Sequence, residues 1–163
     1  AQLKTGKTLL ETTVDNLRAA DLPVLVCLDE LYEGPKLPNS ANSYICKNAD
    51  QGMGSTLAEG AEQIPDWQAV LIVLADMPWV SVDSYMAIAR AAQTSSIVAP
   101  YFESRRGNPV CFGVDFFPEL KKLSGDRGGS QLLKKYDQQM IRLELQDPAI
   151  LQDIDNPYDM KRG

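Results

Sequence analysis

Histidine is missing from this 163-residue chain and cysteine is scarce, present only as Cys27, Cys46 and Cys111. The three cysteines are an odd number, lie far apart and lack the spacing of metal ligands, so the sequence does not favour a zinc site. Free cysteine is among the most buried residue types. We therefore expect three buried, reduced thiols and a reducing compartment.

Long apolar runs and an excess of positive charge are also missing. No apolar run reaches the roughly 18 residues of a membrane-spanning helix, and residues 1–4 lack a signal-peptide pattern. The chain has 16 Lys and Arg against 22 Asp and Glu, a formal net charge of -6. An acidic chain is poorly suited to neutralise nucleic-acid phosphates, so we expect no nucleic-acid partner. From the missing membrane span and signal pattern we expect a cytoplasmic protein with no membrane partner. A polyphosphate ligand would need a metal ion or local cations.

The residues that are present alternate between apolar and amphipathic segments, which is the rhythm of an α/β domain. Hydrophobic residues make up 44% of the chain, enough for the core of one domain spanning residues 1–163. The pattern predicts helices over residues 8–20, 57–63, 82–92, 116–123 and 131–136. It predicts strands over residues 24–28, 44–46, 69–75, 97–99, 109–113 and 141–145.

The most apolar segment, residues 69–75, is continuous rather than alternating, as expected for a central parallel strand covered on both faces. It ends at Asp76, and Pro78 stops the strand. A carboxylate at the carboxyl end of such a strand lies where open α/β sheets place their ligands. Asp76 is therefore our first candidate, although a helix cap or a turn also explains an aspartate there.

A second acidic candidate lies in the tail, where Asp153 and Asp155 form an Asp-x-Asp pattern. Two carboxylates on one face of an extended segment suit Mg²⁺, which prefers one or two carboxylates with phosphate oxygens and water. An Asx-turn or cap before Pro157 is the alternative.

Three turns could bind a nucleotide or another phosphate compound. Gly52-Met53-Gly54-Ser55 combines flexible backbone with the start of a helix, which favours anions. Arg105-Arg106-Gly107-Asn108-Pro109 places two cations in a turn and could clamp a phosphate bidentately. Gly125-Asp126-Arg127-Gly128-Gly129 has the same character. Plain connecting loops remain the alternative for each.

Five motifs, taken in order, resemble the pattern of the molybdenum cofactor cytidylyltransferases, within the wider molybdopterin-guanine dinucleotide biosynthesis-like nucleotidyltransferases. They are Gly52-Met53-Gly54-Ser55-Thr56-Leu57, Leu74-Ala75-Asp76-Met77-Pro78, Arg106-Gly107-Asn108-Pro109-Val110, Ser124-Gly125-Asp126-Arg127-Gly128-Gly129 and Asp153-Ile154-Asp155-Asn156-Pro157. The resemblance implies a three-layer α/β/α, Rossmann-like nucleotidyltransferase fold with a mostly parallel sheet. It also implies CMP transfer from CTP to molybdopterin with release of pyrophosphate.

The resemblance also assigns roles to residues. Asp76 becomes a catalytic residue and Mg²⁺ ligand that also contacts the nucleotide, with Asp155 as the second acid and Asp153 as the substitute. The nucleotide side is Gly52, Gly54 and Ser55, and the acceptor side is Arg106, Gly107, Asn108, Pro109, Gly125 and Asp126. A molybdoenzyme or a chaperone is a possible protein partner of such an enzyme.

One departure from the family pattern concerns the amino terminus. The related enzymes begin with a strand and a Gly-rich loop ending in Arg and then Lys, whereas residues 3–10 here match the segment after that loop. We therefore expect a central strand and loop to precede Ala1, and neither Lys4 nor Lys7 to be the loop lysine. Other functions stay open: a guanylyltransferase or another NTP transferase, a nucleotide-binding or partner-binding module without catalysis, and a sugar-nucleotide glycosyltransferase.

Overall fold

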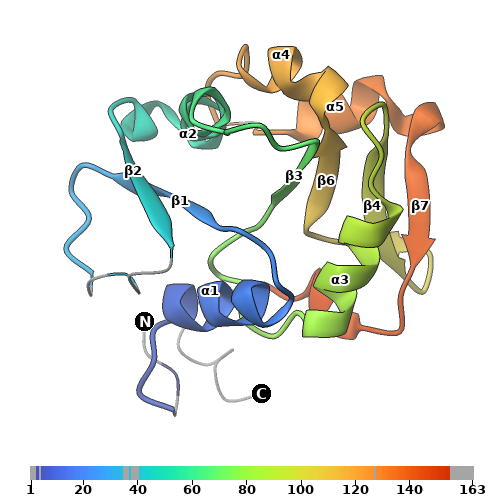
Figure 1. Ribbon diagram of the computed structural model, residues 1–163, viewed down its shortest axis with the longest axis horizontal. Helices are drawn as coiled ribbons and strands as arrows, with labels where there is room; N and C mark the ends of the chain where they lie inside the picture. Colours follow the sequence, from blue (N-terminus) through green and yellow to red (C-terminus); the bar gives the residue numbers. More distant parts are fainter. Residues whose placement is uncertain (1–2, 4, 35–36, 38–40, 127, 155–163) are drawn as a thin grey trace.

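Figure 1 shows the computed structural model, which describes residues 3, 5–34, 37, 41–126 and 128–154. Its α-helices are α1 (Leu9–Ala19), α2 (Met53–Glu62), α3 (Val82–Ala91), α4 (Phe117–Leu120) and α5 (Ser130–Lys135). Its strands are β1 (Leu25–Asp29), β2 (Asn42–Cys46), β3 (Ala69–Ile72), β4 (Ile97–Phe102), β5 (Arg105–Arg106), β6 (Val110–Gly113) and β7 (Ile141–Glu144). Short 3-10 turns include η4 (Pro148–Leu151).

The strands form two sheets in the described part of the chain. β1 and β2 pair in parallel, and the larger sheet has the order β3-β6-β4-β5 with β7 also on β4. Both β3 and β4 run antiparallel to β6, and β7 is parallel to β4. Strands β3, β4 and β7 therefore share one direction, and β6 and the two-residue β5 run against them.

Helices cover both faces of the strands, which confirms the three-layer α/β/α fold. In the view of Figure 1, α1 and α3 lie below the strands, and α2, α4 and α5 lie above them. The upper layer packs through Ala61, Phe117, Leu120, Leu132 and Leu133 against residues of β4 and β6, including Ala99 and Phe112. The lower layer packs through Leu17 and Tyr85 in a cluster that includes Leu71 of β3.

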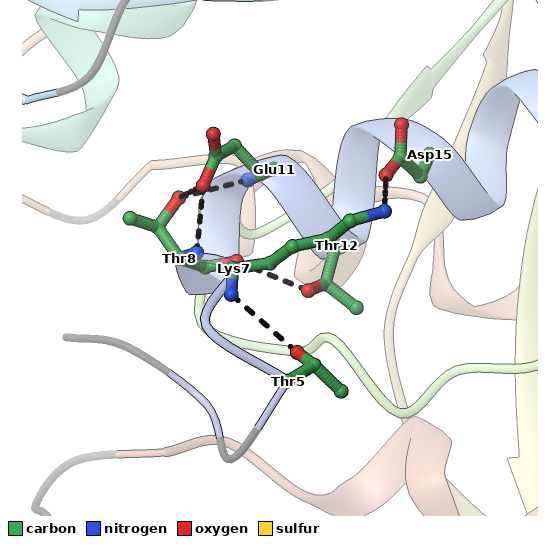
Figure 2. Close-up of polar contacts among 6 residues, drawn as sticks. All are labelled: Thr5, Lys7, Thr8, Glu11, Thr12 and Asp15. Carbon is green, nitrogen blue, oxygen red and sulfur yellow. Dashed lines mark hydrogen bonds and ion pairs between the residues drawn. The ribbon is translucent and has the colours of Figure 1, made fainter.

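Helix α1 begins at a capping box. Thr8 Oγ1 accepts a hydrogen bond from Glu11 N at 3.2 Å, and Glu11 Oε2 accepts one from Thr8 N at 2.7 Å (Figure 2). Lys7, just before the helix, is exposed and donates to Asp15 Oδ2 at 2.7 Å, two turns along the same helix. The capped helix buries Val14 and Leu17 on the face that meets the strands.

Two local predictions were wrong in detail. Helix α2 begins at Met53 instead of Leu57, because Gly52 caps it with a positive φ of 109° and the Gly-Met-Gly-Ser turn is already its first turn. Strand β3 covers only Ala69–Ile72, is half-buried and pairs antiparallel with β6, whereas the sequence predicts a fully buried, central parallel strand over residues 69–75. The edge of β3 away from β6 meets a cavity and no strand of the described residues, which explains the lower burial. No helix in the described ranges is long and apolar enough to cross a membrane.

Candidate active site

Asp76 follows β3 in a loop that α1 holds in place. Thr13 Oγ1 donates to Ala75 O at 3.4 Å, and Asn16 Nδ2 donates to Pro78 O at 3.0 Å. Asn16 Nδ2 also lies 3.5 Å from Val80 O. Asp76 is half-buried between these anchored residues, and its Oδ1 atom is buried. The capped helix α1 thus fixes the backbone on both sides of the first candidate carboxylate.

The acidic tail reaches the same loop from the far end of the chain. Ile154 N donates to Asp76 O at 2.9 Å, and the Ile154 side chain is buried. Asp153, the preceding residue, is exposed beside this bond. Asp155, the likelier second acid, lies outside the described residues. The structure therefore brings Asp153 and Ile154 next to Asp76, although more than 70 positions separate them in sequence.

The turn at Gly107 and Asn108 is fixed to the start of that tail. Gly107 N donates to Pro100 O at 2.9 Å, and Asn108 N donates to Ile150 O in η4 at 2.8 Å. Gly107 has no room for a side chain, because a Cβ there would lie 2.8 Å from Ile150 C. The peptide bond that follows, between Asn108 and Pro109, is cis. We call Asp76, Asp153, Gly107 and Asn108 the acid edge.

Arg105 and Arg106 precede this turn on β5, paired with Phe102 and Tyr101 of β4. Both arginines are exposed. The hairpin that presents them turns at Glu103 and Ser104, whose φ angles are 49° and 64°. Arg106 is therefore held by a two-residue strand and is accessible to a ligand arriving from solvent.

The other two glycine turns, at residues 52–55 and 125–126, are hydrogen-bonded to each other. Gly54 N donates to Gly125 O at 2.7 Å, and Gly125 N donates to Ser55 Oγ at 3.4 Å. A Cβ at Gly52 would meet Asp126 and lie 2.7 Å from Gly125 C, and a Cβ at Gly54 would lie 2.7 Å from Gly125 O. We call Gly52, Gly54, Ser55, Gly125 and Asp126 the glycine pair.

Hydrogen bonds within the glycine pair limit which of its polar groups can bind a ligand. The Gly54 N–H and the buried Ser55 hydroxyl already bond the partner turn, so they support the shape of this turn. Asp126 is exposed at the rim. The resemblance predicts that Gly125 and Asp126 border the same pocket as Arg106 to Pro109, yet the two turns have different partners: one meets the start of α2, the other meets η4.

Asp147 ties the tail to α3. Its Oδ2 accepts from Ser81 N at 3.0 Å and from Ser84 Oγ at 2.7 Å, and its Oδ1 accepts from Ala149 N at 3.0 Å. Burial raises the pKa of this carboxyl, but the hydrogen bonds from Ser84, Ser81 and Ala149 outweigh that effect and leave the pKa below its ordinary value. An ionised Asp147 therefore anchors the tail and the segment after Asp76 together.

The thiols contribute no nucleophile. All three cysteines are free, with Cys46 and Cys111 buried and Cys27 half-buried. Burial raises the pKa of Cys27 and of Cys111 to about 12, so both stay protonated near neutral pH. The prediction of buried thiols is confirmed for Cys46 and Cys111, and it is wrong for the half-buried Cys27.

A metal ion at the acid edge would have few protein ligands. Within the described ranges, no group of three His, Cys, Asp or Glu side chains gathers as a metal site. Asp76 with one acid of the tail still fits Mg²⁺ beside phosphates, because Mg²⁺ is usually held by one or two carboxylates with phosphate oxygens and water. The donor chemistry of the acid edge is therefore compatible with a hard divalent cation.

Sequence reasoning found Asp76 and the tail but missed the residues that position them. Thr13, Asn16 and Asp147 act on partners more than 60 positions away and lie outside the five motifs. Ile154 lies within the tail motif, but its bond to Asp76 O is not visible in the sequence. The one local signal was the capping box at Thr8 and Glu11, which marks where α1 begins.

Comparison with known proteins identifies a family that matches most of the chain. A family described as the MobA-like NTP transferase domain matches residues 1–140. The chain is 30% identical over 164 residues to the purine catabolism protein PucB of Bacillus subtilis (strain 168), covering 96% of this chain and 80% of PucB.

Solved structures show the same fold. The crystal structure of Rv0371c with manganese, from Mycobacterium tuberculosis H37Rv, superimposes with a TM-score of 0.82 at 20% identity, over 96% of this chain and 86% of that one. The 2-C-methyl-D-erythritol 4-phosphate cytidylyltransferase of Thermus thermophilus has a TM-score of 0.69 at 22% identity, over 99% and 89% of the two chains. Because the family match covers most of its length, the chain belongs to the MobA-like NTP transferase family and carries a nucleotidyltransferase domain.

Proposed function

We propose that this protein transfers CMP from CTP to the phosphate of molybdopterin and releases pyrophosphate. The observation that supports the proposal is the hydrogen bond from Ile154 N to Asp76 O, which holds the segment at Asp153 and Ile154 against the loop that contains Asp76. The choice of CTP and of molybdopterin rests on the five ordered motifs of the sequence.

The chemistry needs no protein nucleophile. An oxygen of the acceptor phosphate attacks the α-phosphorus of CTP in line, a new P–O bond forms, and the bond to the β-phosphate oxygen breaks with that electron pair. Pyrophosphate leaves, and the product holds CMP joined to the acceptor through a pyrophosphate bond. The absence of histidine and the protonated thiols of Cys27 and Cys111 are consistent with this route.

Asp76 and an acid of the tail would hold Mg²⁺ in this proposal, with Asp155 preferred and Asp153 as the substitute. When bound, the cation neutralises phosphate charge and orients the reacting phosphates. Because the chain has a formal net charge of -6, a bound triphosphate would need a metal ion or local cations to offset its charge. The manganese in the Rv0371c structure supports a divalent ion in a protein of this fold.

The acceptor side of the proposal is the turn at Gly107 and Asn108 with the neighbouring Arg106. The turn is bonded to Ile150, four residues before Ile154, so it contacts the same segment that leads to Asp76. The Arg106 guanidinium could make two parallel hydrogen bonds to that phosphate. The glycine pair would form the nucleotide side, with Gly52, Gly54 and Ser55 setting its shape.

A guanylyltransferase is the second candidate, because base choice depends on side chains at the rim of the glycine pair. The relative PucB is named for purine catabolism, a clue to physiological context that does not select a base. A partner such as a molybdoenzyme or its chaperone would receive the finished cofactor.

The test compares CTP, GTP and ATP with the natural full-length protein, Mg²⁺ and molybdopterin, following pyrophosphate release. We expect release that requires the acceptor and is fastest with CTP. Faster release with GTP would identify the guanylyl branch. No release with any of the three nucleotides would remove molybdopterin as the acceptor, and nucleotide binding without turnover would favour a non-catalytic binding module.

A further inference from the structure

Glu59 on α2 binds the backbone of the segment that leads into this helix. Its Oε2 atom accepts a hydrogen bond from Lys47 N at 2.9 Å, and its Oε1 atom accepts one from Asn48 N at 2.7 Å. Oε1 also accepts one from Asn48 Nδ2 at 2.9 Å. Both oxygens of one carboxylate are therefore used, although Glu59 lies outside the five sequence motifs.

The Glu59 carboxylate is ionised when it makes these bonds. The hydrogen bond from Lys47 N is the largest influence on the pKa of Glu59 and lowers it below its ordinary value. The hydrogen bonds from Asn48 act in the same direction, and together they outweigh the opposing effect of burial. Hydrogen bonds to an ionised acceptor are stronger than bonds between neutral groups, so near neutral pH Glu59 holds this segment firmly.

The segment that Glu59 holds ends at the nucleotide-side turn. The two residues that it binds follow β2 directly, and the chain then forms η1 (Ala49–Gln51). Asn48 O accepts from Gln51 N at 3.1 Å, and Asn48 Oδ1 accepts from Gln51 Nε2 at 2.9 Å. The first carbonyl of η1 then accepts from Gly52 N at 3.1 Å. A continuous series of hydrogen bonds thus joins Glu59 to Gly52.

The conformation of Gly52 determines where the first turn of α2 lies. Its φ of 109° is in the region that favours glycine, and Gly52 O accepts from Ser55 N at 3.1 Å and from Thr56 N at 3.2 Å. Within the same turn, Gly54 N donates to Gly125 O at 2.7 Å. A shift of the segment before Gly52 would therefore move the two turns of the glycine pair relative to each other.

We infer that Glu59 is a positioning residue, which holds the segment between β2 and Gly52 against α2 and thereby keeps the glycine pair in the shape that binds the nucleotide. The inference rests on the proposed function, in which the glycine pair forms the nucleotide side. Glu59 lies on the second turn of α2, so it acts through Gly52 and not by contact with the nucleotide.

The geometry around Glu59 requires a carboxylate. The backbone N–H groups of Lys47 and Asn48 point to different oxygens of the same side chain. A glutamine has one acceptor oxygen, and its NH2 group would face an N–H donor, so Glu59→Gln should lose at least one backbone bond. Glu62→Gln is the matched control on the same helix. Glu62 makes an exposed ion pair with Lys121 at 3.2 Å, and both variants remove one negative charge.

Amide hydrogen exchange of the natural full-length protein without nucleotide tests the effect on the turn. We expect the Gly54 amide to exchange about fivefold or more faster in Glu59→Gln than in wild type, because its bond to the partner turn opens more often. The Gly107 amide belongs to the acid edge and should exchange at the wild-type rate. Glu62→Gln should change neither amide.

Equilibrium titration with CTP, GTP and ATP in the presence of Mg²⁺ tests the effect on the nucleotide. The Kd of the nucleotide that wild type binds most tightly should rise about fivefold or more in Glu59→Gln and stay unchanged in Glu62→Gln. In turnover with molybdopterin, KM for that nucleotide should rise in the same proportion, with little change in kcat or in KM for the acceptor. A purely structural role of Glu59 would lower Tm without this split between KM and kcat.

Two results would overturn the inference. The first is Gly54 exchange that is the same in Glu59→Gln and Glu62→Gln. The second is faster Gly54 exchange in Glu59→Gln with an unchanged nucleotide Kd, which would separate the shape of the turn from nucleotide binding. Failure of the proposed transfer gives a different pattern: wild type binds a nucleotide but releases no pyrophosphate, whereas Glu59→Gln still binds that nucleotide more weakly than wild type.

Discussion

Asp76 is the residue on which the proposed chemistry depends most. Asp76→Asn keeps the shape of the side chain but removes the charge that would hold a cation, so we expect kcat to fall by about a hundredfold or more with little change in Tm. Steady-state pyrophosphate release and a thermal melt check this. Asp83→Asn, at an exposed position in the first turn of α3, is a control that should keep normal rates. An Asp76→Asn enzyme with near-normal kcat would remove this residue from catalysis.

A substitution at Arg106 tests the proposed acceptor site. Arg106→Lys keeps the charge but loses the planar fork, so kcat/KM for the acceptor should fall by about tenfold, or ~1.4 kcal/mol, with little change for the nucleotide. Arg105→Lys is the matched control from the neighbouring position of β5, where both arginines are exposed. Equal kinetics in Arg106→Lys and wild type would indicate that Arg106 is an ordinary solvated loop residue that does not bind the acceptor. The acceptor site would then be sought near Gly125 and Asp126.

Helix α1 acts as an element that positions the Asp76 loop. Asn16→Ala removes the hydrogen bonds to Pro78 O and Val80 O, so the loop should drift and kcat should fall about three- to tenfold while nucleotide Kd stays unchanged. Asp15→Asn, the next residue on the helix, loses only an exposed ion pair with Lys7 and should leave kcat alone. An equal loss in both variants would indicate a general effect on α1 instead of loop positioning.

The junction of η4 with α3 depends on an ionised Asp147. The pKa of Asp147 lies below its ordinary value of 3.8 in the folded protein, so its ionised form stabilises the fold above the unfolded-state pKa. Asp147→Ala should lower the free energy of unfolding by about 1 kcal/mol at pH 7. That difference should shrink as pH falls through the folded-state pKa of Asp147.

Denaturant unfolding of wild type and Asp147→Ala between pH 7 and pH 3 measures this difference. Asp137→Ala is the control, since Asp137 makes an exposed ion pair with Arg142 at 3.5 Å and its loss should change stability little at any pH. A difference for Asp147→Ala that widens on acidification would show that the neutral carboxyl, and not the ionised one, makes the stabilising bonds.

At the scale of elements, sequence periodicity predicts where the helices and strands lie in the chain but not which elements contact one another in space. The apolar run at 69–75 predicted a strand, and the Thr8 cap predicted where a helix begins, because both are local properties. The pairing of β3 with β6 and the open edge of β3 depend on contacts across the whole chain. The bond from Ile154 to Asp76 was beyond sequence reasoning for the same reason, although both motifs had been recognised separately.

For the whole molecule, the structure divides the predicted site residues into two groups. The acid edge gathers Asp76, Asp153 and the turn at Gly107 and Asn108 around the tail. The glycine pair holds Gly52, Gly54 and Ser55 against Gly125. A nucleotide held by the glycine pair and an acceptor held at the acid edge would have to meet between them for the proposed transfer to occur.

The most direct test of the central claim follows the fate of each phosphate with radiolabelled CTP, using the natural full-length protein, Mg²⁺ and molybdopterin. If the protein is a cytidylyltransferase, label in the α-phosphate must appear in the acceptor product, and label in the γ-phosphate must appear in pyrophosphate. Asp76→Asn should slow both in parallel. Transfer of the γ-label to the acceptor, or retention of the α-label in free nucleotide while the acceptor stays unmodified, would contradict the proposed reaction.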